Sequence, residues 1–287
     1  MWITSISQFG EDFVAGKATG LLLRPGAVLK FSRDDVQEGK FEQLYEHPAA
    51  VWCLGTTSDG EQIASVDYKG NLGVFNRSEA KATLHENAFE RWCQSLVISP
   101  DDQSVVAGNE AGKIFVWNLG DSKVSKSAEV SKASITCIAF SPSGDRIAAS
   151  DGEGIVHLLA WPSLESKGTI KIGEETAWCV AFQDAETLIV GSGDRKLYKC
   201  QASDQAEANA IASGSDWITR LAVSPNGQIA AAEVGGKIHF ASGGSVTTIG
   251  SESGVWALCF NGESELLVGT RKDGVVVAGQ SWGWDSP

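Results

Sequence analysis

One pattern of residues recurs along the chain about every 42 residues, and this repeat limits the possible folds more than any other feature. The run Ile-Thr-Cys-Ile-Ala-Phe-Ser-Pro, which begins at Ile135, has counterparts throughout the chain, and successive copies start 48, 42, 42, 42, 41 and 37 residues apart. Self-similarity at such a period is typical of architectures built from one supersecondary unit per repeat. The seven repeat starts are Ile3, Val51, Cys93, Ile135, Ala177, Ile218 and Val255.

Each repeat contains four short segments that are typical of β-strands. The first is apolar on both faces, as in Ile135 to Phe140, and a polar turn such as Pro225-Asn226-Gly227 follows it. A second apolar segment, a turn glycine, a third strand and a more polar fourth segment complete the unit. Four strands of about five residues with short turns fill one repeat. Helical periodicity is nearly absent, so the pattern predicts an all-β protein.

On these residues the chain resembles the WD-repeat family of β-propellers, whose repeat of about 40 to 45 residues builds a four-stranded blade. The Ser-Pro turns, Asp273-Gly274-Val275 and Trp117-Asn118 carry the resemblance. It covers the whole chain and implies a single domain, residues 1–287, with seven blades of four antiparallel strands. No Gly-His dipeptide occurs, and among the expected third strands Trp117-Asn118 is the near-copy of the family's Trp-Asp ending. We therefore expect the family's buried Asp-His-Ser-Trp hydrogen-bond network to be mostly missing.

The first and last repeats indicate how such a ring would close. Trp2 lies one residue before the first strand of blade 1, so we expect closure by side-chain packing, without a donated N-terminal strand. Gln280 to Asp285 is then expected to supply the outer strand of blade 7. Blade 1 carries six residues more than the mean repeat, which we place within Pro25 to Lys40. The position of its third strand stays open.

Six of the ten tryptophans fall at one of two repeat positions, one residue before or one after the repeat start. Residues two apart on a strand point to the same side. The resemblance implies that the innermost strands begin around the mouth of the channel on the top face, where aromatic residues grip a partner peptide. Alternatively, each indole fills the wedge between neighbouring blades. The six are Trp2, Trp52, Trp92, Trp178, Trp217 and Trp256.

Charged residues accompany the same strand starts. Carboxylates beside indoles favour a cationic guest through Coulomb attraction and cation–π contacts, although solvated loops of an acidic protein would also carry them. Arg220, two residues after a repeat start, stands where other repeats have small residues. It is expected either to project into the channel or to pair with a carboxylate such as Asp216. The acidic residues are Glu90, Glu174, Glu175, Asp216 and Glu252.

Cysteine and histidine also recur at fixed repeat positions. Cys53, Cys137 and Cys179 share a position that small residues occupy in other repeats, which indicates buried filler rather than a thiol site. His157 and His239 share a third-strand position two blades apart, so we interpret both as structural. No cysteine or histidine cluster has the spacing of metal ligands, and we expect no metal or cofactor.

Composition narrows the classes of partner. The chain has 23 basic and 36 acidic residues, a net charge of −13, which opposes binding to nucleic acid or anionic membranes. No apolar run reaches the roughly 18 residues that a membrane span needs. The N-terminal residues lack the basic segment and apolar core of a signal peptide, so we expect a cytoplasmic protein with reduced thiols.

These observations predict a non-enzymatic scaffold that binds a protein or peptide segment, with a basic segment favoured, at the tryptophan-lined top face. The sequence motifs of serine hydrolases, phosphate-binding loops and zinc proteases are absent. One alternative is a subunit that uses the rim as a permanent interface. A metal-dependent propeller hydrolase or lactonase is disfavoured, because the channel-facing positions carry small neutral residues. The oligomeric state stays open.

Overall fold

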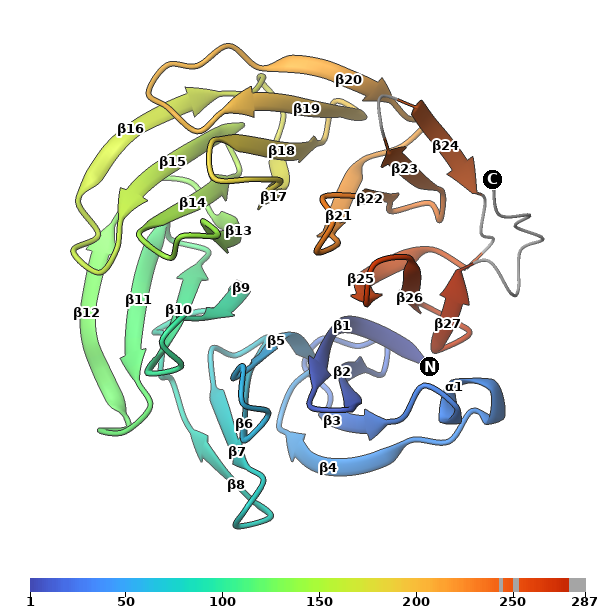
Figure 1. Cartoon of the computed structure of the whole chain (residues 1–287). Helices are drawn as coiled ribbons and strands as arrows, with labels where there is room; N and C mark the ends of the chain where they lie inside the picture. The colour runs from blue at the N-terminus through green and yellow to red at the C-terminus, as the bar shows by residue number, and fades with distance from the viewer. Residues whose placement is uncertain (243–244, 250–252, 279–287) are drawn as a thin grey trace.

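Seven antiparallel sheets stand around a central axis in a computed structural model of the chain, which describes residues 1–242, 245–249 and 253–278 (Figure 1). Each sheet is one blade, and its strands follow one another in sequence order from the axis outward. No described strand pairs with a strand of another sheet. The innermost strands are β1, β5, β9, β13, β17, β21 and β25. The prediction of an all-β, seven-bladed propeller is confirmed.

The strands of the seven blades have the following bounds. Blade 1 consists of β1 (Trp2–Phe9), β2 (Asp12–Ala18), β3 (Gly26–Phe31) and β4 (Glu42–His47), with helix α1 (Asp35–Glu38) between the last two. Blade 2 consists of β5 (Val51–Thr56), β6 (Gln62–Asp67), β7 (Leu72–Asn76) and β8 (Lys81–His85), and blade 3 of β9 (Cys93–Ile98), β10 (Ser104–Asn109), β11 (Lys113–Asn118) and β12 (Lys123–Glu129). Blade 4 consists of β13 (Ile135–Phe140), β14 (Arg146–Asp151), β15 (Ile155–Ala160) and β16 (Ser166–Lys171), and blade 5 of β17 (Ala177–Phe182), β18 (Thr187–Ser192), β19 (Lys196–Gln201) and β20 (Asn209–Ser213). Blade 6 consists of β21 (Ile218–Val223), β22 (Ile229–Glu233), β23 (Ile238–Ser242) and β24 (Ser245–Ile249), and blade 7 of β25 (Val255–Asn261), β26 (Glu265–Thr270) and β27 (Val275–Ala278).

The repeat starts coincide with the beginnings of the innermost strands. Six of them are the first residue of their strand, and Ile3 is the second residue of β1. All seven side chains are fully buried. A residue that is enclosed between two blades must be apolar, and this requirement produces the period seen in the sequence.

The top face is defined here as the face at which the innermost strands begin. The four strands of a blade alternate in direction, so two kinds of connection lie on this face. One joins the second strand to the third, and the other joins the fourth strand to the first strand of the next blade. Residues from these connections and from the strand starts therefore meet at the mouth of the channel.

The extra residues of blade 1 surround its third strand. That strand is β3, and residues 32–41 after it form a connection that contains α1. The left-handed backbone of Gly39, with φ +64°, ends the helix. Val36 of α1 and the nearby Phe41 pack against a hydrophobic cluster shared by blades 1 and 7. The additional segment thus covers the boundary between the first and last blades.

Blades 1 and 7 meet through packed side chains and through the N-terminal amine of Met1, which donates to the Lys272 carbonyl at 2.6 Å. Ile3 and Phe13 of blade 1 belong to one buried cluster with Leu267 of blade 7. Arg33 Nε donates to Glu265 Oε1 at 2.7 Å across the same boundary. Among the described strands, β1 pairs with β2 and none from the N-terminal segment pairs with β27. The predicted outer strand of blade 7, Gln280 to Asp285, lies outside the described residues.

A version of the family's polar network is present where blade 1 meets blade 2. The ring nitrogens of His47 lie 3.2 Å from Asp67 Oδ2 and 2.8 Å from Ser65 Oγ, and Tyr45 Oη lies 2.8 Å from the same hydroxyl. Tyr45 is thus the aromatic member of this network. Smaller versions join His157 to Asp151 at 2.8 Å and His239 to Glu233 at 2.6 Å. The expectation that this network is mostly missing was therefore only partly right.

Candidate functional site at the top face

Four of the six repeat-position tryptophans pack together at the top face. Trp2 contacts Trp52 and Trp256 edge to face, with ring centroids 6.0 and 5.0 Å apart. Trp52 also contacts Trp92 at 5.3 Å, and Tyr68 lies 4.6 Å from Trp92. We call these five residues, from blades 7, 1, 2 and 3, the tryptophan cluster. Such edge-to-face contacts add about 0.5–1.5 kcal/mol per pair beyond the burial of area.

The members of the cluster differ in exposure. Trp2 is 8% exposed, whereas Trp52, Trp92 and Trp256 are half-buried. The indole nitrogens of Trp2 and Trp92 are buried and donate to no protein acceptor. Packing rather than hydrogen bonding therefore holds these two rings in place. For Trp2, filling the wedge between blades describes its position better than exposure at a rim does.

Trp178 and Trp217 form a separate tryptophan pair on blades 5 and 6. Their rings stack with centroids 5.7 Å apart and planes at 25°, and Trp217 is 49% exposed. Blade 4 carries Ser134 and Thr136 at the two tryptophan positions, so no indole stands between this pair and the cluster on that side. Trp217 is thus the exposed member of the pair, whereas Trp178, next to blade 4, is half-buried.

The predicted carboxylates differ in whether they already have a partner. Glu90 pairs with Lys113 Nζ at 2.9 Å, and Asp216 accepts the backbone N–H of Trp217 at 2.8 Å. Glu175 is exposed on the connection that precedes Trp178. Glu175 and Asp216 therefore stand beside the tryptophan pair, whereas Glu90 already has a cationic partner. Glu252 lies outside the described residues.

Sequence reasoning missed an apolar loop beside the cluster. Leu21 and Leu23, between β2 and β3, are 62% and 65% exposed, while Leu22 packs against the cluster. The carbonyl of Leu22 accepts the backbone N–H of Ala50 at 2.9 Å, which ties the loop to blade 2. The loop and Tyr68 line a groove of about 550 Å³. Three consecutive leucines between Gly20 and Pro25, within a turn, were the available signal.

Beneath the rim lies a cavity of about 160 Å³ in the channel, lined by residues from all seven blades. Arg220 lines it, with Nε donating to the Trp256 carbonyl at 2.6 Å and Nη1 to the Thr219 carbonyl at 2.7 Å. Its Cζ lies 5.8 Å from the centre of the Trp256 ring. Of the two expectations for Arg220, projection into the channel describes the structure, because no described carboxylate lies within 4 Å of its nitrogens.

The three cysteines at the shared repeat position line the same cavity and connect successive blades. The thiols of Cys53, Cys137 and Cys179 donate to carbonyls of the next blade at 3.5–3.6 Å. Burial raises the pKa of Cys53 to about 11 and raises the pKa values of the other two as well. They are therefore neutral at pH 7, and no metal-ligand group of three or more forms among the described residues.

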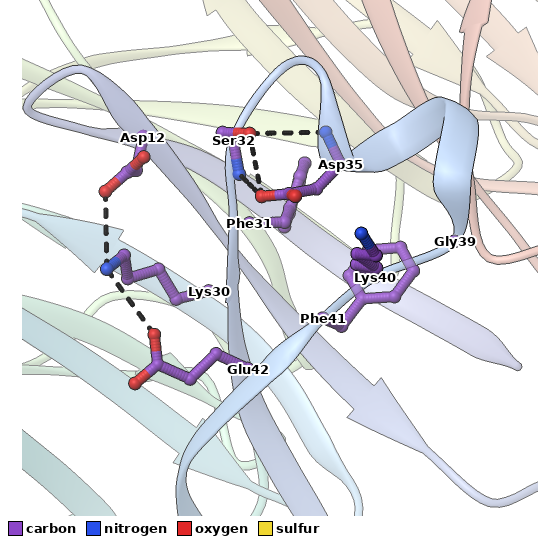
Figure 2. Close-up of a pocket in the computed structure, with 9 residues that line it drawn as sticks. All are labelled: Asp12, Lys30, Phe31, Ser32, Asp35, Gly39, Lys40, Phe41 and Glu42. Carbon is purple, nitrogen blue, oxygen red and sulfur yellow. Dashed lines mark hydrogen bonds and ion pairs between the residues drawn. The ribbon is translucent and has the colours of Figure 1, made fainter.

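A larger groove lies on the outer part of blade 1, next to α1 (Figure 2). Its volume is about 590 Å³, and its charged side chains are paired or hydrogen-bonded, Lys40 with Glu38 of α1. Lys30 lies 3.5 Å from Asp12 and 3.4 Å from Glu42, and Ser32 donates to Asp35 from its backbone and its hydroxyl (Figure 2). These bonds from Ser32 hold the pKa of Asp35 below its usual value. These interactions stabilise the connection between β3 and α1, and they leave no unpaired charged group in the groove for a ligand.

Comparison with known proteins supports the family resemblance. The family model described as "WD domain, G-beta repeat" matches residues 124–158, which run from β12 into β15. Meiotic recombination protein rec14 of Schizosaccharomyces pombe is 27% identical over 62% of this chain and 61% of its own length. Autophagy-related protein 16 of Arabidopsis thaliana is 28% identical over 42% of this chain and 25% of its own length.

A third relative is the tRNA (guanine-N(7)-)-methyltransferase non-catalytic subunit of Caenorhabditis elegans, 30% identical over 38% of this chain and 29% of its own length. The chain thus spans about three fifths or less of each of these relatives. No helix in the described residues is long and apolar enough to cross a membrane. The seven radial sheets form a β-propeller, and the matched repeat and the relatives show that the chain is similar to the WD-repeat family.

Proposed function

We propose that this protein is a non-enzymatic interaction scaffold that binds a segment of a partner protein across its top face. One observation carries the proposal. The three most exposed large apolar side chains in the described residues, Leu21, Leu23 and Trp217, all belong to connections on this face. The other exposed large apolar residues are only 36–38% exposed. Exposed apolar patches bounded by polar residues mark interaction sites, and tryptophan is enriched among residues that dominate binding energy.

The relatives support the coarser part of this proposal. One relative is described as a non-catalytic subunit, so a protein similar to this chain belongs to a larger assembly. Because the aligned regions cover only part of each relative, their partners are not transferred to this protein. The top face as the binding surface rests on the exposed side chains described above.

The finer part of the proposal is that the partner presents a basic residue to the tryptophan pair. Asp216 adjoins Trp217 and Glu175 lies on the connection before Trp178, and a cation over an exposed indole gains about 0.5–1 kcal/mol. A net charge of −13 would also speed the approach of a basic segment at low salt. Leu21 and Leu23 would then receive apolar side chains of the same segment.

The test compares wild-type protein with a variant that carries Leu21→Ser, Leu23→Ser and Trp217→Ala. Proteins that cross-link to the wild type in an extract of the cells that make it are identified and then assayed individually for direct binding. We expect the triple variant to weaken the direct binding by tenfold or more, since each hot-spot residue contributes upwards of about 1–2 kcal/mol. Ile211→Ser, on the outer strand β20, is the matched control and should bind normally.

Equal binding by the triple variant and the wild type would exclude this surface. The basic partner has its own test, the double variant Glu175→Gln with Asp216→Asn. This variant should bind more weakly and with less dependence on salt than the wild type. Unchanged affinity and salt dependence would contradict the cationic guest and leave the apolar part of the proposal standing.

A further inference from the structure

Three cations border the apolar loop of blade 1. Arg24 follows the leucines and lines the same groove of about 550 Å³. Lys17 and Arg271 line a second hollow of about 250 Å³, and Gly20 lines both, so the two hollows adjoin. Arg24 and Arg271 are exposed, and Lys17 is partly exposed. None of the three pairs with a carboxylate in the described part of the chain, so their charges are free to pair with a partner.

Arg271 is held at the edge of the tryptophan cluster. Its guanidinium carbon Cζ lies 5.4 Å from the centre of the Trp2 ring, and its backbone N–H donates to the Gly254 carbonyl at 3.1 Å. Trp2 also belongs to a buried cluster against which Leu22 packs. The cation and the leucine loop therefore rest on the same packed centre, so a partner that binds them has few further side chains to order.

The charge around the loop is opposite in sign to that of the whole chain. The top-face connections within blade 1, within blade 2 and between them contain the cations Arg24 and Lys69 and no aspartate or glutamate. These connections are residues 19–25, 48–50 and 68–71. In blade 7, the connection 271–274 adds two cations against one carboxylate, Asp273. With a net charge of −13 for the chain, this part of the face is an exception.

The surroundings of the tryptophan pair have the opposite charge. The four top-face connections between β14 and β21 carry carboxylates and a single cation, Arg195. The carboxylates are Glu153, Glu174, Glu175, Asp194 and Asp216. Blades 5 and 6 lie across the central axis from blades 1 and 2 (Figure 1). The top face is therefore basic on the side of the leucine loop and acidic on the other side.

We propose that the leucine loop and the hollow beside it bind an acidic, apolar segment of the partner protein, an inference that rests on the function proposed above. Apolar side chains of the segment would cover Leu21 and Leu23. Its carboxylates would pair with Arg24, Lys17 and Arg271, and a planar guanidinium matches a carboxylate with two parallel hydrogen bonds. A basic segment would be repelled from this side, so the same cations supply selectivity as well as affinity.

The charge distribution also sets the orientation of the segment. A segment that spans the face would carry its acidic, apolar part over blades 7, 1 and 2 and its basic residue over the tryptophan pair. The reversed orientation would place like charges together at both ends, which costs affinity.

An anionic membrane shares part of this chemistry but fits the surface less well. The net charge of −13 opposes approach to negatively charged lipid. The exposed leucines border hollows of about 550 and 250 Å³, which side chains of a segment can enter and a flat bilayer surface would leave empty. We therefore assign the site to a protein segment.

The experiment titrates the purified protein with a synthetic peptide in which leucines alternate with pairs of aspartates, and follows the fluorescence anisotropy of a dye on the peptide. We expect saturable binding that weakens as salt rises, because exposed charge pairs are screened. Two counterparts, with asparagine in place of aspartate or serine in place of leucine, should each bind at least about tenfold more weakly. Their comparison separates the charged part of the interaction from the apolar part.

Charge reversal on the protein tests the same contacts. Arg24→Glu with Arg271→Glu should weaken binding of the aspartate peptide about tenfold or more at low salt, with a smaller effect at high salt. Lys132→Glu with Lys199→Glu is the matched control and should bind as the wild type does, since both lysines are exposed, pair with no described carboxylate and change the net charge equally. Urea denaturation checks that the variants fold. If the double variant does not fold, Arg24→Gln in the exposed loop decides, and it should still weaken binding.

Three results would overturn the proposal: no saturation by about 1 mM aspartate peptide, equal binding of the asparagine counterpart, or full binding by the charge-reversed variant. Binding to phosphatidylserine vesicles without binding to the peptide would also overturn it, in favour of a membrane.

The outcomes also separate this proposal from the function on which it rests. If Leu21→Ser, Leu23→Ser and Trp217→Ala together weaken binding of the cellular partner but the charge-reversed variant binds that partner normally, the surface stands and the acidic segment is wrong. If the triple variant still binds the partner fully, the proposed function is wrong and this inference falls with it.

Discussion

The tryptophan cluster and the tryptophan pair occupy equivalent repeat positions, but their surroundings differ. In the cluster, indoles from adjacent blades 7, 1, 2 and 3 contact one another edge to face, and Tyr68 adds a further ring. In the pair, two rings stack next to a blade that has no indole at either position. The same residue type at the same position thus serves packing in one half of the ring and exposure in the other. The number of rings in contact with each indole, two to four other rings in the cluster and one in the pair, accompanies this difference.

The largest test of this comparison is stability. Trp2→Ala removes a nearly buried indole from the cluster and should lower the free energy of unfolding by about 3–5 kcal/mol. Trp217→Ala removes a ring that is 49% exposed and should cost roughly 1 kcal/mol or less. Urea denaturation of both variants measures the difference. Similar losses would show that the two groups do not differ in structural role.

The pH dependence of stability tests the boundary between blades 1 and 2, which lies next to the cluster. Burial by itself would raise the pKa of Asp67, but hydrogen bonds from His47 and Asn71 outweigh it, and the pKa lies below the ordinary 3.8. A carboxylate with a lowered pKa stabilises the fold above its unfolded-state pKa and loses that contribution as pH falls through the folded-state value. Stability should therefore decline on acidification from about pH 5 downward.

Asp67→Asn should be less stable than the wild type at pH 7 and should lose less stability on acidification. Urea midpoints measured from neutral to acidic pH give both quantities. Asp121→Asn, at an exposed position, is the control and should follow the wild-type curve. A parallel curve for Asp67→Asn would mean that this network does not contribute to the acid sensitivity.

The smallest expected effect concerns solvent access. Acrylamide should quench Trp217 far more than Trp2, so Trp217→Phe should lower the overall quenching constant and Trp2→Phe should leave it nearly unchanged. Ten tryptophans contribute to the signal, which keeps the change modest. If Trp2→Phe lowers quenching as much as Trp217→Phe, the assignment of cluster and pair to different environments is wrong.

The sequence predicted the blades well because their inner strands repeat one physical requirement. Ile135, Ala177 and Val255 are enclosed by neighbouring blades and must be apolar, which leaves a regular signal. The third strand of blade 1 escaped prediction because the non-repeating residues around α1 obscured the period. The network of His47 with Ser65 and Asp67 was also missed, since its members come from two repeats and lack the Gly-His spelling.

The candidate site was less accessible from sequence. Position alone identified the tryptophans, but their exposure depends on rings from other blades, such as Tyr68 beside Trp92. Leu21 and Leu23 lie in a connection, where no period constrains the residue type. The sequence marked Arg220 as unusual, but only the folded arrangement of all seven blades shows that no described carboxylate reaches it.

The boundary between blades 1 and 7 has a consequence for how the ring assembles. Contacts such as that between Arg33 and Glu265 join residues 232 apart, whereas Thr4 reaches Val51 of the next blade over 47 residues. Loop-closure entropy grows only with the logarithm of length, so this boundary costs about 1.4 kcal/mol more than its neighbours. This difference in free energy is small at equilibrium, but blades 1 and 7 must both have formed before the boundary between them can form. Folding should therefore proceed through an open arc of blades, with closure of the circle as the last and slowest step.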